Sequence, residues 1–431
     1  MAGSIGIRRE DKSEWERRVP LTPEQVRALV ESGVDVVVQP SPIRAYPDDA
    51  YSAAGATVDE DLSNCAMVLA VKEIPRQLLR QGGAYLFFSH TIKGQQDNMP
   101  MLQRLIDLGC TLIDYEKIVD DKGRRLVFFG RHAGLAGMID TLWAFGQRMT
   151  AGGIATPLSE IEPAHRYPDL DAARERIVAI GKRLASEGVP RRLQPLVCGF
   201  AGYGNVSQGA QAIYDLLPVE PIAVEDLASV KPASDRVFKV VFHEEHLVRP
   251  VDTDARFELQ EYYDHPERYQ GVFETHLPHL TMLVNCIYWT EAYPRLVSKE
   301  WVRRTWAEQQ RPTLRVIGDI SCDIGGAVEV TLKATDSGSP VFVYEAKTGK
   351  LLPGVQGHGP VVLAVDNLPC ELPVESSTSF GEALAPFLGA LAGIDTGGTL
   401  ADSKLPDELE RAVILWRGEL TSGFEYLRDF L

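Results

Sequence analysis

The stretch that decides the fold is "PLVCGFAGYGNVSQGA", residues 195–210. Its apolar first half predicts a buried strand, and the glycines that follow predict a tight turn into a helix. A dinucleotide site needs this arrangement, because one glycine makes the turn, a second lets the backbone approach a pyrophosphate, and small residues let the helix pack closely. Ser207 takes the position of the third glycine. The strand before the turn and the helix after it favour dinucleotide binding over an ordinary tight turn.

Two acidic residues follow this turn by about twenty positions. Glu225 and Asp226 lie in "PIAVEDL", where a predicted strand ends. An acid at that point of a dinucleotide fold binds a ribose hydroxyl and favours NAD over NADP. The spacing therefore predicts that Glu225 contacts the cofactor.

Short apolar strands alternate with helical stretches on both sides of the turn, which predicts an α/β fold with mainly parallel sheets covered on both faces. The first alternation runs from "SIGIRRE" (4–10) to "RLVFFG" (125–130), and it includes a helix that Thr22 and Gln25 open as a capping box and Gly33 ends. The second alternation runs from residue 193 to about residue 335.

We therefore expect two Rossmann-like domains separated by a cleft. The first is discontinuous, residues 1–130 plus 336–431, and the second is a dinucleotide-binding domain of residues 131–335. The apolar helix predicted over 133–149 is expected to connect them, with Gly134 and Gly137 allowing a neighbour to approach closely. A hairpin is predicted over 339–354, a strand over 361–369, and two helical stretches after them.

Composition excludes several classes of protein. The 431 residues carry a net charge of -16, which disfavours binding to nucleic acid or an anionic membrane. No apolar run is long enough to cross a membrane, and a cytoplasmic protein is expected. Six scattered cysteines without a C-x-x-C pair indicate reduced thiols. "HEEH" (243–246) and "THLPH" (275–279) lack the helical spacing of zinc ligands, so no metal site is expected.

Charged residues gather where predicted strands end in the first third of the chain. The carboxyl ends of parallel strands meet at one edge of a sheet, so these side chains are expected to lie close together. Each one alone is better explained as an ordinary surface charge. The set is Glu16, Arg18, Lys72, His90, Lys93, Glu116 and Arg125.

Several long blocks in order carry a family resemblance, among them "FFSHTIKGQ" (87–95), "GRRLVFFGRHAGLAGMIDTL" (123–142) and "GDISCDIGGAVE" (318–329). The chain resembles the lysine-ketoglutarate reductase half of aminoadipic semialdehyde synthase, the fungal saccharopine dehydrogenases more distantly, and the wider alanine dehydrogenase/transhydrogenase superfamily. The resemblance implies condensation of L-lysine with 2-oxoglutarate and reduction of the imine to saccharopine. The separate saccharopine-oxidising domain is expected to be absent.

The resemblance also implies roles for the charged set. Lys72 and His90 match the acid/base pair of the family, and Glu16 and Glu116 are expected to tune them. Carboxylates of the substrates are expected to bind at positively charged side chains, with one acid, Asp319, facing substrate or cofactor. The expected substrate-binding residues are Arg18, Lys93, Arg125 and Asp319.

For the cofactor, the resemblance implies that Gly202, Tyr203, Gly204, Asn205 and Val206 form the phosphate turn. Ile287 and Tyr288 end a later strand where the nicotinamide is expected. The closer relatives imply NADPH, whereas Glu225 favours NADH, so NADPH is the prediction and NADH the alternative.

Three other functions stay open. One is an alanine dehydrogenase, which would use pyruvate and ammonia; another is a different amino-acid or opine-type reductase. The third is a non-catalytic, cofactor-binding regulator, against which the presence of a proton-transfer pair argues. The expected partners are small molecules (L-lysine, 2-oxoglutarate and saccharopine), and a homo-oligomer is left open.

Overall fold

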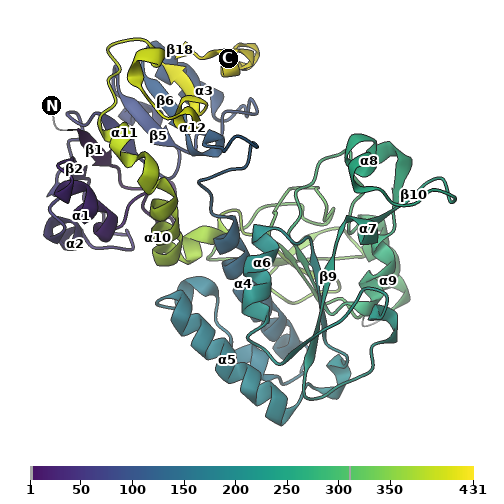
Figure 1. The fold of residues 1–431 in the computed structure, drawn as a ribbon. Coiled ribbons are helices and arrows are strands. Elements are labelled where there is room, and N and C mark those ends of the chain that lie inside the picture. The colour runs from purple at the N-terminus through teal and green to yellow at the C-terminus, as the bar shows by residue number, and fades with distance from the viewer. Residues whose placement is uncertain (1–2, 310–311) are drawn as a thin grey trace. The chain divides into compact units, whose positions relative to one another are not determined.

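The computed structural model describes residues 3–309 and 312–431 and divides into two compact units (Figure 1). Unit 1 contains the chain up to Phe129 together with Pro373–Leu431, and unit 2 contains Gly130–Leu372. Each unit is built on an eight-stranded sheet. None of the helices formed by the described residues is long and apolar enough to cross a membrane.

The sheet of unit 1 has the order β18-β17-β6-β5-β4-β1-β2-β3, and all neighbours from β6 to β3 are parallel. Its strands are β1 (Ser4–Ile7), β2 (Asp35–Val38), β3 (Thr57–Val58), β4 (Met67–Leu69), β5 (Ala84–Phe87), β6 (Thr111–Asp114), β17 (Val413–Trp416) and β18 (Glu419–Leu420). Its helices are α1 (Pro23–Glu31), α2 (Asp48–Ala53), α3 (Met99–Asp107), α10 (Pro373–Leu384), α11 (Leu388–Ala392) and α12 (Asp407–Glu410).

Helix α1 begins and ends as its sequence predicts. The Thr22 side chain accepts a hydrogen bond from the backbone N–H of Gln25, and the Gln25 side chain accepts one from the backbone N–H of Thr22 at 2.8 Å. Gly33 lies just beyond the helix with a φ of +89°, a left-handed conformation that glycine adopts without strain. The predicted capping box is confirmed.

The strand predicted over 125–130 is wrong, and a strand near the C-terminus was missed. In this run Arg125 forms only an isolated bridge with Val119, because the edge of β6 is occupied by β17, which pairs with it antiparallel. Val127 lies in the core instead, and the ring of Phe129 stacks on Phe380 with 4.5 Å between centroids, whereas Phe128 is exposed. The predicted return of the C-terminal segment to unit 1 therefore includes strands as well as helices.

The sheet of unit 2 has the order β15-β14-β16-β13-β12-β7-β9-β8 and is parallel from β16 to β8. Its strands are β7 (Val197–Ala201), β8 (Val219–Pro221), β9 (Val237–Phe242), β12 (Met282–Asn285), β13 (Val316–Asp319), β14 (Val341–Tyr344), β15 (Leu351–Pro353) and β16 (Val361–Leu363), with β10 (Val248–Pro250) and β11 (Tyr269–Gly271) as a separate pair. Its helices are α4 (Gly130–Ala151), α5 (Leu170–Glu187), α6 (Asn205–Tyr214), α7 (Glu244–Leu247), α8 (Leu259–Asp264) and α9 (Lys299–Glu308).

Alternate residues of the central strands of unit 2 enter two different cores. Cys198 and Phe200 of β7 pack with α4 and α5, whereas Val197 and Ala201 pack with α9 and the segment around β11. Strand residues point alternately to the two faces, so both faces are apolar and both are covered, as in the predicted α/β fold.

The predicted boundary at residue 336 is wrong, because the segment 336–372 belongs to unit 2. Its strand β16 pairs with β13 in parallel, and β14 then pairs with β16 in the opposite direction. The hairpin of β14 and β15 is confirmed as a hairpin, but it extends the second sheet. β16 thus pairs with the edge of β13 that β12 leaves open, and the chain returns to unit 1 only at Pro373.

Helix α4, predicted as a connector over 133–149, is longer and belongs to unit 2. It packs so closely on α6 that a Cβ atom added at Gly134 would lie 1.9 Å from the carbonyl oxygen of Val206. A Cβ atom at Gly137 would lie 2.7 Å from Ile320. The predicted close approach at both glycines is confirmed, and Figure 1 shows α4 and α6 side by side.

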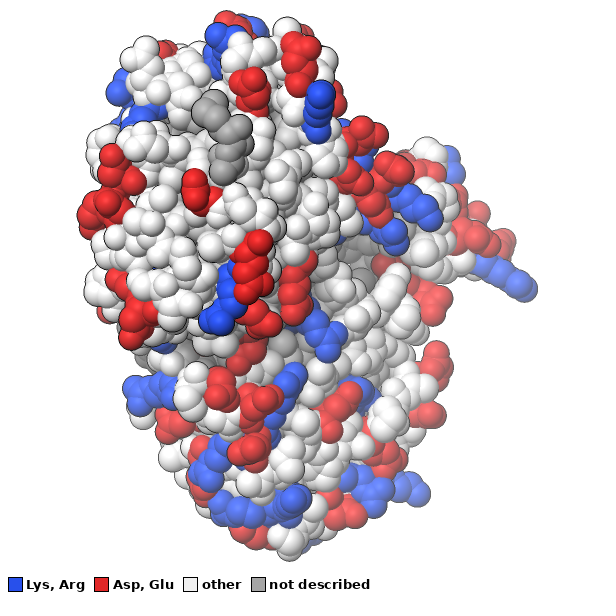
Figure 2. All heavy atoms as spheres, turned by 60° about the vertical axis from the view of Figure 1, so that its left-hand side comes forward, with Lys and Arg blue, Asp and Glu red and all other residues white. Residues whose placement is uncertain are grey.

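Charges of both signs share the surface. On the face that Figure 2 shows, Lys and Arg side chains stand among Asp and Glu side chains. That face therefore offers a polyanion no continuous basic surface, in keeping with the net charge of -16.

Candidate functional site

Charged side chains of unit 1 gather where three adjacent parallel strands end. Lys72 and Glu73 follow β4, His90 follows β5, and Glu116 follows β6. The register of β4 on β5 and of β5 on β6 brings these ends to the same edge of the sheet. The sequence-based prediction that strand-end charges come together therefore holds for this part of the set.

His90 is held by a carboxylate that the sequence analysis did not select. Its Nδ1 lies 2.5 Å from Oε1 of Glu73, and Lys12 Nζ lies 2.9 Å from Oε2 of the same side chain. Burial alone would raise the pKa of Glu73, but His90 and Lys12 outweigh it and lower that pKa to about 2. Glu73 is therefore a carboxylate at every working pH, and it orients the imidazole.

The backbone at His90 is also constrained. Its φ is +50°, which few residues other than glycine adopt without strain. The side-chain amide of Asn98 donates to the His90 carbonyl oxygen at 3.2 Å. The ring, with about a third of its side-chain surface exposed, thus combines a fixed position with access to solvent.

Lys72 occupies an environment that disfavours its charged form. Burial is the first cause of its lowered pKa, and the positive charge of Arg18 is the second. The backbone N–H of Lys72 donates to Glu10, whose carboxylate also accepts from the N–H of Val71 at 2.6 Å. Burial, and then the charge of Glu16, raise the pKa of Glu10 to about 7. This buried carboxyl group anchors the turn that carries Lys72.

Glu16 and Arg18 form a buried, two-pronged ion pair. Arg18 Nε and Nη2 donate to the two oxygens of Glu16 at 2.7 and 2.6 Å, and the side chains are 2% and 1% exposed. The guanidinium lies 4.2 Å from the centre of the Phe129 ring. The pair supplies fixed charge close to Lys72, since both members act on its pKa.

The remaining predicted residues of unit 1 lie further out. Arg125 is half exposed and donates to Glu116. Lys93 is exposed on the turn after His90, where its backbone N–H donates to Gln95 at 3.0 Å. The structure thus pairs the arginines with the two predicted glutamates, a pairing that the sequence did not indicate.

Sequence reasoning missed Glu10, Lys12 and Glu73. Glu73 directly follows Lys72 in the block "VKE", and Glu10 and Lys12 lie in "REDK" after β1. Their positions at strand ends were a usable signal. What the sequence lacked was the pairing of β1 with β4, which brings residues 10–12 beside residues 71–73.

In unit 2 the glycine turn adopts the conformation that its sequence predicts. Gly202 has a φ of +94°, and a Cβ atom there would lie 2.9 Å from Ile287. Gly204 is the N-cap of α6, and no atom lies within 4 Å of the position of its missing Cβ. The turn, with Asn205 and Val206 opening the helix, leaves backbone room for a phosphate at a helix N-terminus.

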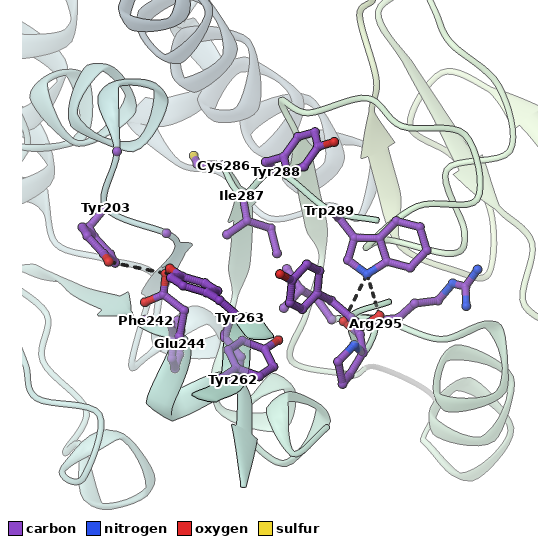
Figure 3. A pocket seen from close by; sticks show the side chains of 16 residues that line it. Tyr203, Phe242, Glu244, Tyr262, Tyr263, Cys286, Ile287, Tyr288, Trp289 and Arg295 are labelled. Carbon is purple, nitrogen blue, oxygen red and sulfur yellow. Dashed lines mark hydrogen bonds between the residues drawn. The ribbon is translucent and has the colours of Figure 1, made fainter. Parts of the chain in front are cut away.

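A pocket of about 370 Å³ opens beside this turn (Figure 3). Its walls are mainly aromatic and apolar, with Glu244 and Arg295 as the charged members. The described lining residues are Gly202, Tyr203, Gly204, Phe242, Glu244, Leu247, Tyr262, Tyr263, Cys286, Ile287, Tyr288, Trp289, Tyr293, Pro294, Arg295 and Leu296. The predicted Tyr203, Ile287 and Tyr288 therefore share one pocket.

Asp319 ends β13 but is buried. Its oxygens accept hydrogen bonds from Thr331 Oγ1 at 2.5 Å and from Asn285 Nδ2 at 2.8 Å. Burial, partly offset by these two donors, raises its pKa to about 6. With an exposed fraction of 1%, Asp319 links β12, β13 and the following loop in this structure and presents no free oxygen to a ligand.

Glu225 and Asp226 do not line the pocket. Both are exposed in a turn after β8, which ends at Pro221 and lies one strand away from β7. On the side of β8, the strand that pairs with β7 is β9, and the acid that follows β9 is Glu244. The spacing rule assumes that the next strand in sequence is also the neighbour in the sheet, whereas here β9 lies between β7 and β8.

Comparisons with known proteins agree with this architecture. Residues 6–136 match the family described as "Alanine dehydrogenase/PNT, N-terminal domain", and residues 267–423 match "Alanine dehydrogenase/PNT, C-terminal domain". The solved structure of an L-alanine dehydrogenase superposes with a TM-score of 0.63 at 19% identity, covering 99% of this chain and 100% of that one. A transhydrogenase from Sinorhizobium meliloti gives a TM-score of 0.56 at 16% identity, covering 97% and 100%. These likenesses show a fold of two Rossmann-like domains.

Curated relatives are more similar in sequence. "Alpha-aminoadipic semialdehyde synthase" of Arabidopsis thaliana is 38% identical over 448 residues, which cover 99% of this chain and 41% of the relative. The mitochondrial protein of that name from Bos taurus is 36% identical, covering 98% and 47%. The chain thus spans less than half the length of these two relatives. "Saccharopine dehydrogenase (NAD(+), L-lysine-forming)" of Yarrowia lipolytica is 29% identical, covering 91% and 93%.

Proposed function

We propose, from the premise that the chain belongs to the alanine dehydrogenase/PNT family, that it is a lysine-2-oxoglutarate reductase. It would condense the ε-amine of L-lysine with 2-oxoglutarate and reduce the imine to saccharopine with a nicotinamide cofactor. The observation that carries this proposal is the pair at one edge of the unit 1 sheet: Lys72 with a lowered pKa, and His90 held by Glu73. Similarity to the aminoadipic semialdehyde synthases over nearly the whole chain supports lysine as the amine.

The chemistry requires two proton-transfer groups. The ammonium of lysine must lose a proton before its nitrogen attacks the keto carbon, and the resulting carbinolamine oxygen must gain protons to leave as water. Lys72, whose pKa is lowered by burial and then by the charge of Arg18, is proposed to take the first proton. His90, whose ring is held through Nδ1 by Glu73, is proposed as the second proton-transfer group.

The substrates bring several carboxylates, for which exposed cations are needed. Arg125 and Lys93 are the proposed ligands, since both are exposed on loops after the unit 1 strands. Arg18 was predicted to bind substrate, but two of its donors are hydrogen-bonded to Glu16. We therefore propose that the positive charge of Arg18 acts on Lys72 by lowering its pKa. Glu116 is proposed to position Arg125. Asp319 is proposed to position the loop after β13.

Unit 2 is proposed to bind the cofactor. The turn of Gly202 to Val206 would hold the pyrophosphate at the N-terminus of α6, where no atom lies within 4 Å of the missing Cβ of Gly204. Ile287 and Tyr288 would contact the nicotinamide half. When bound, the cofactor supplies the hydride that reduces the imine carbon. The resemblance implies NADPH, which is the proposed cofactor, and the name of the Yarrowia relative states NAD(+), so NADH is kept as the alternative.

One assay tests this function against its closest rival. The protein is given reduced cofactor with lysine plus 2-oxoglutarate, and separately with pyruvate plus ammonium, and the product is identified by mass. Saccharopine from the first pair supports the proposal. Turnover of the second pair alone would indicate an alanine dehydrogenase, and cofactor binding without turnover of either pair would indicate a regulator.

A cytoplasmic location and a homo-oligomeric assembly are also proposals. Cell fractionation tests the location. Size-exclusion chromatography with light scattering tests the assembly.

A further inference from the structure

We propose that a second pocket of unit 2, at the amino edge of its parallel strands, binds a small multivalent oxyanion. Such a ligand carries a phosphate group or several carboxylates. The pocket has a volume of about 360 Å³, which suits a small molecule. It shares no described lining residue with the aromatic pocket beside the glycine turn, so the proposal does not depend on the proposed function.

Three segments that lie far apart in the sequence meet at this pocket. Arg148 lies in the last turn of α4, Arg315 directly precedes β13, and His358 lies between β15 and β16. Strands β13 and β16 are parallel neighbours, and the N–H of Val361 donates to the carbonyl oxygen of Arg315 at 3.0 Å. Residues that precede these two strands therefore share one edge of the sheet, which is opposite to the edge of the glycine turn after β7.

The charge of the pocket is the first support. Of the described residues that line it, two are arginines, one is a histidine and none is a carboxylic acid, although the chain carries a net charge of -16. A cleft lined by one sign of charge concentrates ions of the opposite sign, and apolar walls strengthen this effect. Met149 and Trp306, which are both buried, supply such walls. The pocket therefore favours an anion.

The second support is the environment of the Arg148 guanidinium. Its hydrogen bonds go to backbone carbonyls alone: Nη1 donates to Val355, and Nη2 donates to Gly357 at 2.9 Å and to Gly359 at 3.0 Å. It forms no ion pair with a carboxylate of the described residues. Burial lowers the pKa of Arg148, and the charge of Glu345 only partly opposes this. A half-buried cation that only neutral carbonyls contact is stabilised when an anion binds beside it.

The donors of the pocket suit an anion with several oxygens. The three hydrogen bonds to carbonyls fix Arg148 in place, and its Nε and one N–H of Nη1 have no acceptor among the described residues. An oxyanion that accepts from Arg148 would gain further from the charge of Arg315 in the same pocket. The exposed side chain of His358 adds a third group that can donate. Phosphate or citrate therefore fits better than chloride.

The test is binding of inorganic phosphate to the full chain by isothermal titration calorimetry, at an ionic strength held constant with sodium chloride. Citrate, which carries carboxylates only, is the second probe. We expect saturable binding of at least one of them and a matching rise in the unfolding temperature, because a ligand that binds the folded state stabilises it. Binding of phosphate alone identifies a phosphate group as the ligand, and binding of citrate alone identifies carboxylates. Binding of neither would overturn the proposal.

Four variants place the binding in this pocket. Arg315→Gln should raise the dissociation constant by about 10-fold, the equivalent of one hydrogen bond to a charged group, whereas Arg315→Lys keeps the charge and should lose less. His358→Glu puts a carboxylate on an exposed side chain of the pocket and should weaken binding by about 5-fold. The matched controls are Arg256→Gln and His265→Glu, which lie exposed in unit 2 and outside the pocket, and both should bind as the wild type does.

The proposed function offers an anion two other sites, the glycine turn of unit 2 and Arg125 of unit 1. The titration is therefore repeated with saturating reduced cofactor and with Arg125→Gln, and both should leave the affinity unchanged. Binding that is lost in either case but kept in Arg315→Gln and His358→Glu would overturn the proposal. If Arg315→Gln does not fold, His358→Glu decides, because its exposed side chain forms no hydrogen bond with the described residues. Absence of saccharopine formation would refute the proposed function and leave this result unaffected.

Discussion

The two units carry their chemistry at the same place in similar sheets but with opposite residue types. The carboxyl edge of the unit 1 sheet holds titratable groups within hydrogen-bonding distance of one another: His90, Glu73 and Lys12, with Lys72 beside them. The corresponding edge of unit 2 holds a glycine turn and an aromatic pocket. The sheets supply positions, and the residues after each strand give the first edge its titratable groups and the second edge its glycine turn and aromatic rings.

Burial shifts pKa values at both edges, but on different residue types. In unit 1 burial lowers the pKa of Lys72 and raises the pKa of Glu10 to about 7, which brings both groups toward neutral pH. At the edge of unit 2, burial raises the pKa of Asp319 to about 6 and raises the pKa of the half-buried Cys286 thiol, which stays protonated. Changes at the first edge should therefore alter rates, and changes at the second should alter binding and stability.

The largest effect is expected for Lys72→Met, which removes a proposed proton-transfer group from unit 1. Turnover of lysine plus 2-oxoglutarate should fall by about 100-fold or more, as for other lost acid/base groups, while the affinity for NADH stays unchanged. Steady-state rates and a binding titration measure the two quantities. Lys122→Met, in an exposed turn, is the control and should keep the wild-type rate. A full rate in Lys72→Met would remove this residue from the mechanism.

The next effect is expected for Gly134→Ala, which breaks the packing beneath the glycine turn of unit 2. The added methyl group would collide with the Val206 carbonyl and push α4 from α6, at a cost of about 1 to 3 kcal/mol in unfolding free energy. Thermal unfolding and NADH binding should both weaken. Gly389→Ala is matched to it, because that helical glycine has no atom within 4 Å of the added carbon. Equal stability of the two variants would contradict the close packing.

A smaller effect is expected for Glu73→Gln, which removes the carboxylate that orients His90. Turnover should fall by about 10-fold, the equivalent of one charge-assisted hydrogen bond, with cofactor affinity unchanged. The pKa of Glu73 is lowered from 4.5 to about 2, so its stabilising contribution is present above pH 4.5 and is lost as the pH falls toward 2. The variant should therefore lose less stability in acid than the wild type. Glu31→Gln, at an exposed site on α1, is the control for loss of one negative charge. If the stability of Glu73→Gln depended on pH as that of the wild type does, the role of Glu73 would be refuted.

The smallest effect is expected for Asp140→Asn, within a buried carboxyl pair of unit 2. Burial, and then neighbouring Glu371, raise the pKa of Asp140 far above 3.8, so the stability that it contributes below pH 3.8 is lost as the pH rises. Asparagine keeps an acceptor for the N–H of Ala164, which lies 2.7 Å from Asp140 Oδ1, and cannot ionise.

At pH 8 the unfolding temperature of Asp140→Asn should lie about 2 to 4 °C above that of the wild type, the shift that about 1 kcal/mol of unfolding free energy produces in a unit of this size. This gain in unfolding temperature should shrink toward pH 4. Differential scanning calorimetry measures both. Asp254→Asn, an exposed site, should show no such trend. Unlike Glu73→Gln, Asp140→Asn should leave turnover unchanged. This result would separate a change in unit 1 that alters the rate from a change in unit 2 that alters only stability.

Local sequence determined the features that depend on neighbouring residues. The capping box of Thr22 and Gln25, the left-handed turn at Gly202 and the close helix contact at Gly134 follow from residue type and short spacing, because caps, turns and steric fit act over a few positions. The accumulation of charge after β4, β5 and β6 was also visible, because parallel strands share one carboxyl edge.

Only the tertiary structure decided which distant segments are neighbours. The pairing of β16 with β13 moved residues 336–372 into unit 2, and the pairing of β17 with β6 displaced the strand predicted over 125–130. The insertion of β9 between β7 and β8 replaced Glu225 by Glu244 at the pocket. Sheet order is set by which apolar faces and free edges fit in three dimensions, and spacing along the chain carries little information about that choice.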